Sequence, residues 1–374
     1  MSAAPRAPSV LALAAMLLGG AGCIFAAIAD ERAFFPAWLA SFLFWVSVPL
    51  AAVTLVLVHD LTGGRWMRTA RPVLSAAAAT MPVSAIAFLP ILAGLGHLYV
   101  WSEPGKPGLG NAFYLNDTFF IARYAVYFVI WNAAAFWALA APRDGAVGVA
   151  PALSWISAVG LLLLAFSVTF AAFDWVMSIE PHFWSSIFGM LWGSNAFVTG
   201  LALLLLVLAL SPRAAPAARD AYRDDMADLA AILLATTIFW AYTEFLQFLI
   251  IWEEDLHSEI PWYLHRMAGA WQGVIYAIAG SGFFIPFFVL LWTPSKRNRA
   301  IVAAICALML IAHLVYGWWQ VLPDMRATHF GWIDVAAFFA LGGLWMLLFL
   351  FCLSSPRPLL RRAAPATRKE AQHG

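Results

Sequence analysis

Long stretches that are nearly free of charged side chains dominate this 374-residue chain. A run of about 20 apolar residues is long enough to cross the hydrocarbon core of a bilayer as an α-helix. A helix also satisfies its own backbone hydrogen bonds, as the bilayer core requires. We therefore predict an all-α polytopic membrane protein with about ten transmembrane helices. The predicted spans are centred roughly on residues 10–29, 36–58, 73–96, 119–140, 149–171, 183–210, 228–252, 266–292, 300–321 and 333–354.

The composition agrees with a lipid bilayer as the environment of the chain. Hydrophobic residues make up 63% of it and charged residues only 11%, whereas an ordinary soluble domain has about 25% charged residues. The net charge of +1 argues against nucleic acid as a partner. Pro82, Pro90 and Pro286 fall inside predicted spans, where we expect kinks.

The placement of Lys and Arg predicts the orientation. Cytoplasmic loops of membrane proteins are enriched in these residues. The first apolar run is longer than a usual signal-peptide core, so we interpret it as an uncleaved membrane helix. We predict that both termini are cytoplasmic and that loops 173–182 and 253–266 are periplasmic. Sixteen of the 21 Lys and Arg residues support this, in the N-terminal tail, loops 59–72, 141–148, 211–227 and 293–299, and the tail 355–374.

Metal ligation is not expected in this chain. Cys23, Cys306 and Cys352 all lie in apolar runs without a C-x-x-C motif, which argues against iron–sulfur, zinc or c-type haem sites. A b-type haem in a helix bundle needs two buried axial histidines, and His313 is the only histidine well inside a span. We therefore predict no haem, no iron–sulfur cluster and no other metal.

Glu244 is the clearest ionisable residue within a predicted helix. It shares a helical face with Trp240, Gln247 and Ile251, which follow the spacing of successive turns. Ionisable groups in membrane helices are costly and usually face the interior of a bundle. Glu244 is a candidate proton-transfer group, and Trp240 and Gln247 suit the wall of a quinone pocket. The alternative is an interfacial carboxylate that is hydrated through the following loop.

Further polar side chains lie within spans or at their ends. His313 shares a face with Tyr316 and is either an interhelical hydrogen-bonding group or a member of a proton relay. His97 closes the third span, and Arg123 is one turn inside the fourth; both are candidates for a quinone pocket. A simple salt bridge between Asp117 and Arg123 is the role that we expect first for that pair.

The connection from Phe173 to Gly193 concentrates polar and aromatic residues between two apolar runs. Asp174, Glu180 and His182 lie there with three tryptophans. Each residue alone fits an aromatic anchor belt at the membrane surface, with Pro181 starting the next helix and Asp174 capping a turn. Together they supply acid–base groups at the predicted periplasmic side. Asp174 and His182 are therefore candidate proton-transfer groups.

Several of these segments resemble one family. They are similar to the second of two NrfD/PsrC-like (polysulfide-reductase-type) integral membrane subunits of alternative complex III, a quinol:electron-acceptor oxidoreductase. The resemblance covers roughly residues 90–340. The segments that carry it are His97–Trp101, Tyr114–Trp131, Phe173–Gly189, Gln247–Trp252 and Ile260–Trp271.

The resemblance implies a fold and a set of partners. One membrane domain would span residues 1–374 in the bacterial inner membrane, with two four-helix bundles flanked by two peripheral helices. The partners would be a paralogous NrfD-like membrane subunit, a periplasmic iron–sulfur/molybdopterin-type subunit and c-type cytochrome subunits, which would receive the electrons. The implied parts are helix 10–29, bundle one over 36–171, bundle two over 183–321, helix 333–354 and the tail 355–374.

Three functions remain open at this point. The first is a quinol-linked redox subunit that contributes a quinol site, a proton path or both, with menaquinone or ubiquinone as the quinone. The second is a structural membrane anchor for redox partners without its own quinol site. The third is a proton channel or solute transporter, although transporters tend to have their charged sites at the membrane midplane.

Overall fold

The structure is a computed structural model that describes residues 6–64, 66–103, 112–141, 149, 153–211, 219–325 and 330–355. Its regular structure within these ranges is helical, without strands. Ten helical segments of the described chain are long and apolar enough to span a membrane. This confirms the predicted all-α, multi-pass class.

The helices follow the predicted spans closely, and most differences are at their ends. Their bounds are α1 Arg6–Ala29, α2 Glu31–Thr62, α3 Arg71–Ala78, α4 Met81–Ala87, α5 Leu89–Ala93, α6 Leu95–Leu98, α7 Asp117–Ala140, α8 Ser154–Trp175, α9 Phe188–Leu210, α10 Arg219–Glu254, α11 Pro261–Met267, α12 Trp271–Ile278, α13 Ile285–Leu291, α14 Thr293–Lys296, α15 Arg299–Met325 and α16 Trp332–Ser354.

Proline divides the third span into short helices. Pro82 and Pro90 occupy the first turns of α4 and α5, because a proline has no backbone N–H to continue the preceding helix. In the eighth span, Pro286 opens α13 directly after a π-helical segment, Ala279–Phe284. The helical pattern is therefore interrupted before Pro82 and Pro90 and changes before Pro286, and a kink at each proline stays a prediction.

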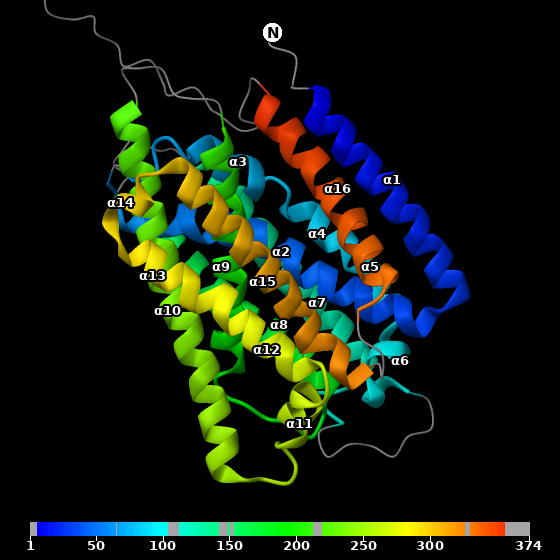
Figure 1. The fold of residues 1–374 in the computed structure, drawn as a ribbon. Helices are drawn as coiled ribbons and strands as arrows, with labels where there is room; N and C mark the ends of the chain where they lie inside the picture. Colours follow the sequence, from blue (N-terminus) through cyan, green and yellow to red (C-terminus); the bar gives the residue numbers. More distant parts are fainter. Residues whose placement is uncertain are drawn as a thin grey trace, which may run out of the picture.

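Helix α2 occupies the middle of the helix array. It packs against α3, α8, α9, α15 and α16, and its residues are buried along most of its length. Helices α1 and α16 lie side by side at the edge of the molecule (Figure 1). Small residues allow this close approach, because a Cβ on Gly19 would lie 2.5 Å from the backbone of Ala340.

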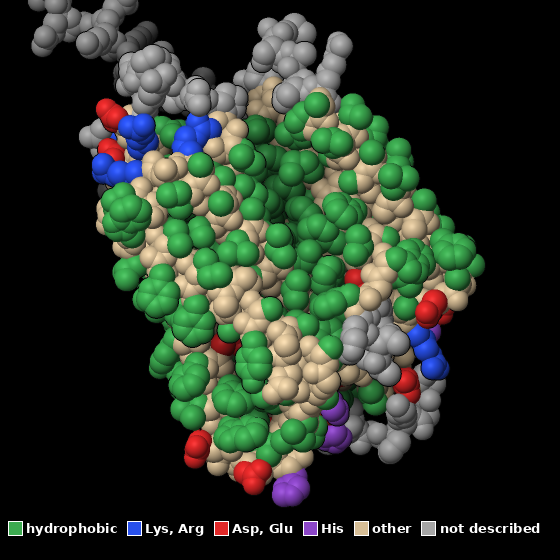
Figure 2. All heavy atoms as spheres, in the orientation of Figure 1, with side chains coloured by type: hydrophobic (Ala, Val, Ile, Leu, Met, Phe, Trp, Pro, Cys, Tyr) green, Lys and Arg blue, Asp and Glu red, His purple; other side chains and the backbone are tan. Residues whose placement is uncertain are grey.

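The described chain begins and ends on the same side of the helix array (Figure 1). The connection between α8 and α9 and the loop before α11 lie on the opposite side, which we call the site end. On the face in Figure 2, most basic side chains lie near the chain ends, next to some acidic ones, and histidine and further acidic side chains lie toward the site end. Which side of the membrane each end faces stays a prediction.

The connection between α8 and α9 is longer than expected. Helix α9 begins at Phe188, so the predicted start at residue 183, with Pro181 opening the helix, is wrong. The Phe183 ring stacks on Trp262 with 4.4 Å between ring centroids, and the Ser185 hydroxyl donates a hydrogen bond to Gln247 Oε1. These tertiary contacts hold the segment outside the helix.

Candidate functional site

A buried ion pair joins α7 to the last turn of α8. Arg123 Nε donates a hydrogen bond of 2.8 Å to Asp174 Oδ2, and the Tyr127 hydroxyl donates to the same oxygen at 2.6 Å. Asp174 is only 1% exposed. The Arg123 guanidinium also lies over the Tyr114 ring, 3.9 Å from its centroid. We call Tyr114, Arg123, Tyr127 and Asp174 the Asp174 cluster.

This arrangement corrects two expectations. The predicted Asp117–Arg123 salt bridge is wrong, because Asp117 is exposed in the first turn of α7 while Arg123 turns inward to Asp174. The Asp174 side chain does not cap the following turn either. A buried carboxylate is costly unless a cation and hydrogen bonds compensate it, and Arg123 and Tyr127 provide both.

Three polar atoms of the Asp174 cluster are buried without a hydrogen-bond partner among the described residues. They are Asp174 Oδ1, Arg123 Nη2 and the Tyr114 hydroxyl. Burial raises the pKa of Tyr114, and the nearby Asp174 carboxylate raises it further. Because buried polar atoms are nearly always paired in proteins, these atoms indicate a place for water or for a polar group of a ligand.

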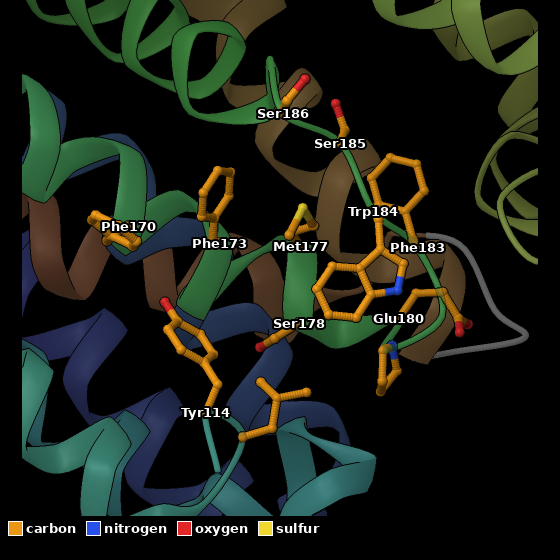
Figure 3. Close-up of a pocket in the computed structure, with 12 residues that line it drawn as sticks. Tyr114, Phe170, Phe173, Met177, Ser178, Glu180, Phe183, Trp184, Ser185 and Ser186 are labelled. Atoms are coloured by element: carbon orange, nitrogen blue, oxygen red, sulfur yellow. The ribbon is translucent and has the colours of Figure 1, made fainter. Parts of the chain in front are cut away.

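A cavity of about 420 Å³ adjoins this cluster at the site end. Tyr114 lies on one side of it and Trp184 on the other, with Met177 and Ser178 between them (Figure 3). Phe170 and Trp184 are 42% and 52% exposed, so the cavity is flanked by side chains on the molecular surface. Its full lining is Tyr114, Leu115, Phe170, Phe173, Met177, Ser178, Glu180, Pro181, Phe183, Trp184, Ser185 and Ser186.

A second polar cluster connects α10 to α15. The Tyr316 hydroxyl donates a hydrogen bond to Glu244 Oε1, and Gln320 Nε2 lies 2.6 Å from the Tyr316 hydroxyl oxygen. Tyr316 and Gln320 are buried and Glu244 is half-buried. The face of α10 that was predicted from residue spacing is therefore turned toward the protein interior. We call Glu244, Tyr316 and Gln320 the Glu244 cluster.

His313 and Trp240 continue this polar region away from the site end. His313 Nδ1 lies 2.6 Å from Asn195 Oδ1 on α9, so this histidine makes an interhelical hydrogen bond. The Trp240 ring packs against His313, with 4.6 Å between ring centroids. His313 Nε2 and Trp240 Nε1 are buried without a hydrogen-bond partner among the described residues.

Toward the site end, Arg266 and Asp324 link the Glu244 cluster to His265 at the surface. Arg266 is completely buried, and its Nη2 donates to the Gln320 carbonyl and to Asp324 Oδ2, both at 2.5 Å. Burial lowers the pKa of Arg266, and Asp324 opposes that shift. Asp324 Oδ1 also lies 2.9 Å from Nδ1 of His265, whose side chain is 51% exposed. Polar contacts thus run from Glu244 to an exposed histidine.

The connection between α8 and α9 contacts both regions. Ser185 lines the cavity beside the Asp174 cluster, and its hydroxyl donates to Gln247, which is 2% exposed. Gln247 lies one turn beyond Glu244 on α10. The predicted pocket residue Gln247 is therefore held against the wall of the cavity. Trp240, by contrast, lies next to the Glu244 cluster, against His313.

Two predicted site residues lie apart from these clusters. His97 Nε2 lies 3.1 Å from the Glu31 carboxylate, and the His97 ring stacks on Phe35. His182 is exposed, and its backbone N–H donates to Glu180 at 3.4 Å. Within the described chain, neither histidine forms a hydrogen bond or ion pair with Asp174 or Glu244.

Sequence reasoning missed Tyr114, Arg266 and Asp324 as members of these clusters. Asp324 follows Tyr316 and Gln320 at helical spacing, which is a signal that it shares their face. No comparable spacing links Arg266 to α15, because α11 is a separate short helix. Within the described ranges, no group of three His, Cys, Asp or Glu residues is arranged to hold a metal ion.

Comparison with models of known protein families gives no match for this chain, and a search of curated proteins finds no match either.

Proposed function

We propose that this chain is a membrane subunit of a quinol:electron-acceptor oxidoreductase of the alternative complex III type, with a quinol site in the cavity beside the Asp174 cluster. The single observation that carries the proposal is that cavity. Its volume of about 420 Å³ and its aromatic lining are joined to a buried carboxylate–guanidinium pair. Ligand pockets commonly have volumes of about 300–1,000 Å³ and a few convergent polar groups.

The chemistry of a quinol fits these residues. A quinol headgroup is a flat aromatic ring with hydroxyl groups, and it carries an apolar tail that must remain in the bilayer. Aromatic side chains favour stacking on such a ring, and Phe170 and Trp184 provide an apolar edge where the tail would leave. The unpaired polar atoms of the Asp174 cluster would bind a hydroxyl group.

The helix contacts support the proposed arrangement in two four-helix bundles. In the first bundle, α2 contacts α3, α7 and α8, and α7 contacts α8; in the second, α9 contacts α10 and α15, and α12 contacts α15. Helix α2 also contacts α9 and α15, so the two proposed bundles pack against each other. In the proposal, α1 and α16 are the peripheral pair, and both chain ends face the cytoplasm of a bacterium. The electrons would pass to iron–sulfur and c-type haem partner subunits, beside a paralogous membrane subunit.

Glu244 is the second proposed proton-transfer group. A charged side chain in the middle of a membrane helix costs roughly 2.5–3.5 kcal/mol on insertion scales, so a carboxylate there needs a reason. Its contacts lead through Tyr316 and Gln320 toward Arg266 and the exposed His265. We propose that Glu244 and Tyr316 exchange protons and that Asp324 and His265 exchange them with water at the site end. Gln320 and Arg266 do not release protons and hold these two pairs in place.

A second candidate is a subunit that anchors partners and conducts protons without binding quinol. The chain of contacts from Glu244 to His265 favours it, because those contacts do not involve the cavity. A direct binding measurement separates the two candidates.

The test is a fluorescence-quenching titration of the full chain in membranes with heptyl-hydroxyquinoline N-oxide, a quinol analogue. We expect saturable binding that Ser186→Trp abolishes, because Ser186 lines the cavity and an indole would fill it. Ser281→Trp, in the π segment between α12 and α13, is the matched control and should bind normally, because Ser281 does not line the cavity. Absence of saturable binding to the wild-type chain would favour the anchor.

A further inference from the structure

Tyr114 is the member of the Asp174 cluster that reaches the cavity. It is in the cavity lining, whereas Arg123, Tyr127 and Asp174 are not. Its side chain comes from the turn before α7 and points along the cavity wall toward Phe170 and Phe173 of α8 (Figure 3). Any ligand in the cavity therefore meets Tyr114 before it can meet the buried carboxylate.

The position of the Tyr114 ring is fixed from behind. The Arg123 guanidinium lies 3.9 Å from the ring centroid, and Arg123 Nη1 donates a 2.9 Å hydrogen bond to the Tyr114 carbonyl. The hydroxyl at the end of this ring is buried and has no hydrogen-bond partner among the described residues. A fixed ring with an unpaired hydroxyl is arranged to bind a group that the protein itself does not supply.

We propose that Tyr114 contacts the quinol headgroup and relays its first proton to Asp174. This inference rests on the proposed function and adds a residue and a step to it. Asp174 Oδ1 is the acceptor, because Oδ2 already receives hydrogen bonds from Arg123 and Tyr127 while Oδ1 receives none.

The proposed step conserves atoms and charge. The quinol O–H bond breaks as its proton moves to the Tyr114 oxygen. The Tyr114 O–H bond breaks as its own proton moves through a bridging water to Asp174 Oδ1, since the two atoms are not hydrogen-bonded to each other directly. Tyrosine is unchanged at the end, the carboxylate has become a carboxylic acid, and the quinol oxygen is left as an anion. No electron moves in this step. The surroundings of Tyr114 favour its protonated form, since burial and then Asp174 raise its pKa, so its hydroxyl carries a proton to pass on.

A purely structural role for Tyr114 would require only its ring, as a cover for the Arg123 guanidinium. Tyr114→Phe keeps that ring and removes the hydroxyl, so it separates the two roles. Tyr124→Phe is the matched control, because the Tyr124 hydroxyl donates to the Ala85 carbonyl and Tyr124 does not line the cavity.

The experiment measures binding of heptyl-hydroxyquinoline N-oxide to the full chain in membranes, and decylubiquinol oxidation by the assembled complex. We expect Tyr114→Phe to bind the analogue about 3- to 10-fold more weakly, as for one lost hydrogen bond. Turnover should fall by at least about tenfold through the lost proton relay. Tyr124→Phe should change neither. Unchanged binding and turnover in Tyr114→Phe, with normal binding by the wild-type chain, overturn the role of Tyr114 and leave the proposed quinol site intact.

Two further outcomes are informative. A wild-type chain that does not bind the analogue overturns the proposed function itself. If Tyr114→Phe does not assemble, a fluorotyrosine at position 114 preserves the shape of the side chain and makes its hydroxyl a stronger donor. Analogue binding should then tighten at least about twofold, and unchanged affinity would overturn the inference.

Discussion

Arg123 Nε lies 2.8 Å from Asp174 Oδ2, although 51 residues separate them in the sequence. The pair fixes the first turns of α7 against the last turn of α8, and both residues are buried. The cavity and the connection to α9 are built on this end of α8. The pair is therefore the structural base of the proposed site.

Removing one partner of this pair should cost more than removing both. Arg123→Leu leaves the Asp174 carboxylate buried without a cation, so we expect the free energy of unfolding to fall by about 3–5 kcal/mol. Arg123→Leu combined with Asp174→Leu should be clearly more stable than Arg123→Leu alone. Thermal denaturation in one detergent compares the stability of the wild-type chain, the single variant and the double variant. Equal stability of the single and double variants would argue that the pair is not buried as described.

Phe183 should anchor the connection between α8 and α9. Its ring is 1% exposed and stacks on Trp262, so Phe183→Ala should lower the free energy of unfolding by about 3–5 kcal/mol. Phe113→Ala is the control, because Phe113 is 83% exposed, and it should change stability little. A similar small change in both variants would show that the stacking does not hold the connection.

Much of the fold could be predicted because it depends on chain-wide composition. Runs of about 20 apolar residues predict membrane helices without knowledge of their neighbours, and the residue spacing placed Trp240 and Gln247 on a buried face. The partner of Arg123 could not be predicted in this way. Asp117 is six residues away and Asp174 is on another helix, so only the packing of α7 on α8 decides between them.

The same limit applies to the rest of the site. The length of the apolar run predicted an early start of α9, but the partners that hold Phe183 and Ser185 outside the helix, Trp262 and Gln247, are on α11 and α10. Tyr114 begins one of the segments that carry the family resemblance, but nothing in that segment marks it as a cavity residue. Its importance comes from an unpaired hydroxyl beside a cavity, which are properties of the folded chain.

Glu244 should be needed for turnover but not for assembly. Glu244→Gln keeps the size of the side chain and can still accept a hydrogen bond from Tyr316, but it cannot ionise. We expect quinol oxidation by the complex to fall at least about tenfold, as for loss of a proton-transfer group. Asp117→Asn, an exposed carboxylate of α7, should not change it. Full activity of Glu244→Gln between about pH 6 and pH 8 would remove Glu244 from the proton path.

The orientation can be tested with introduced cysteines. His182→Cys and Ser258→Cys place thiols at exposed positions of the site end, and Arg297→Cys places one on the opposite side. We expect a membrane-impermeant maleimide to label the first two in intact cells and to label Arg297→Cys only after lysis. The reverse pattern would place the site end in the cytoplasm.

Photolabelling with an azidoquinone tests the central claim most directly, because it reports where a quinone binds. The assembled complex is illuminated in membranes, and the labelled peptides of this chain are identified by mass spectrometry. Binding in the cavity predicts label within residues 170–186 or at Tyr114, and excess unlabelled quinone should prevent it. Label confined to other helices of this chain, or to partner subunits, would contradict a quinol site in this cavity.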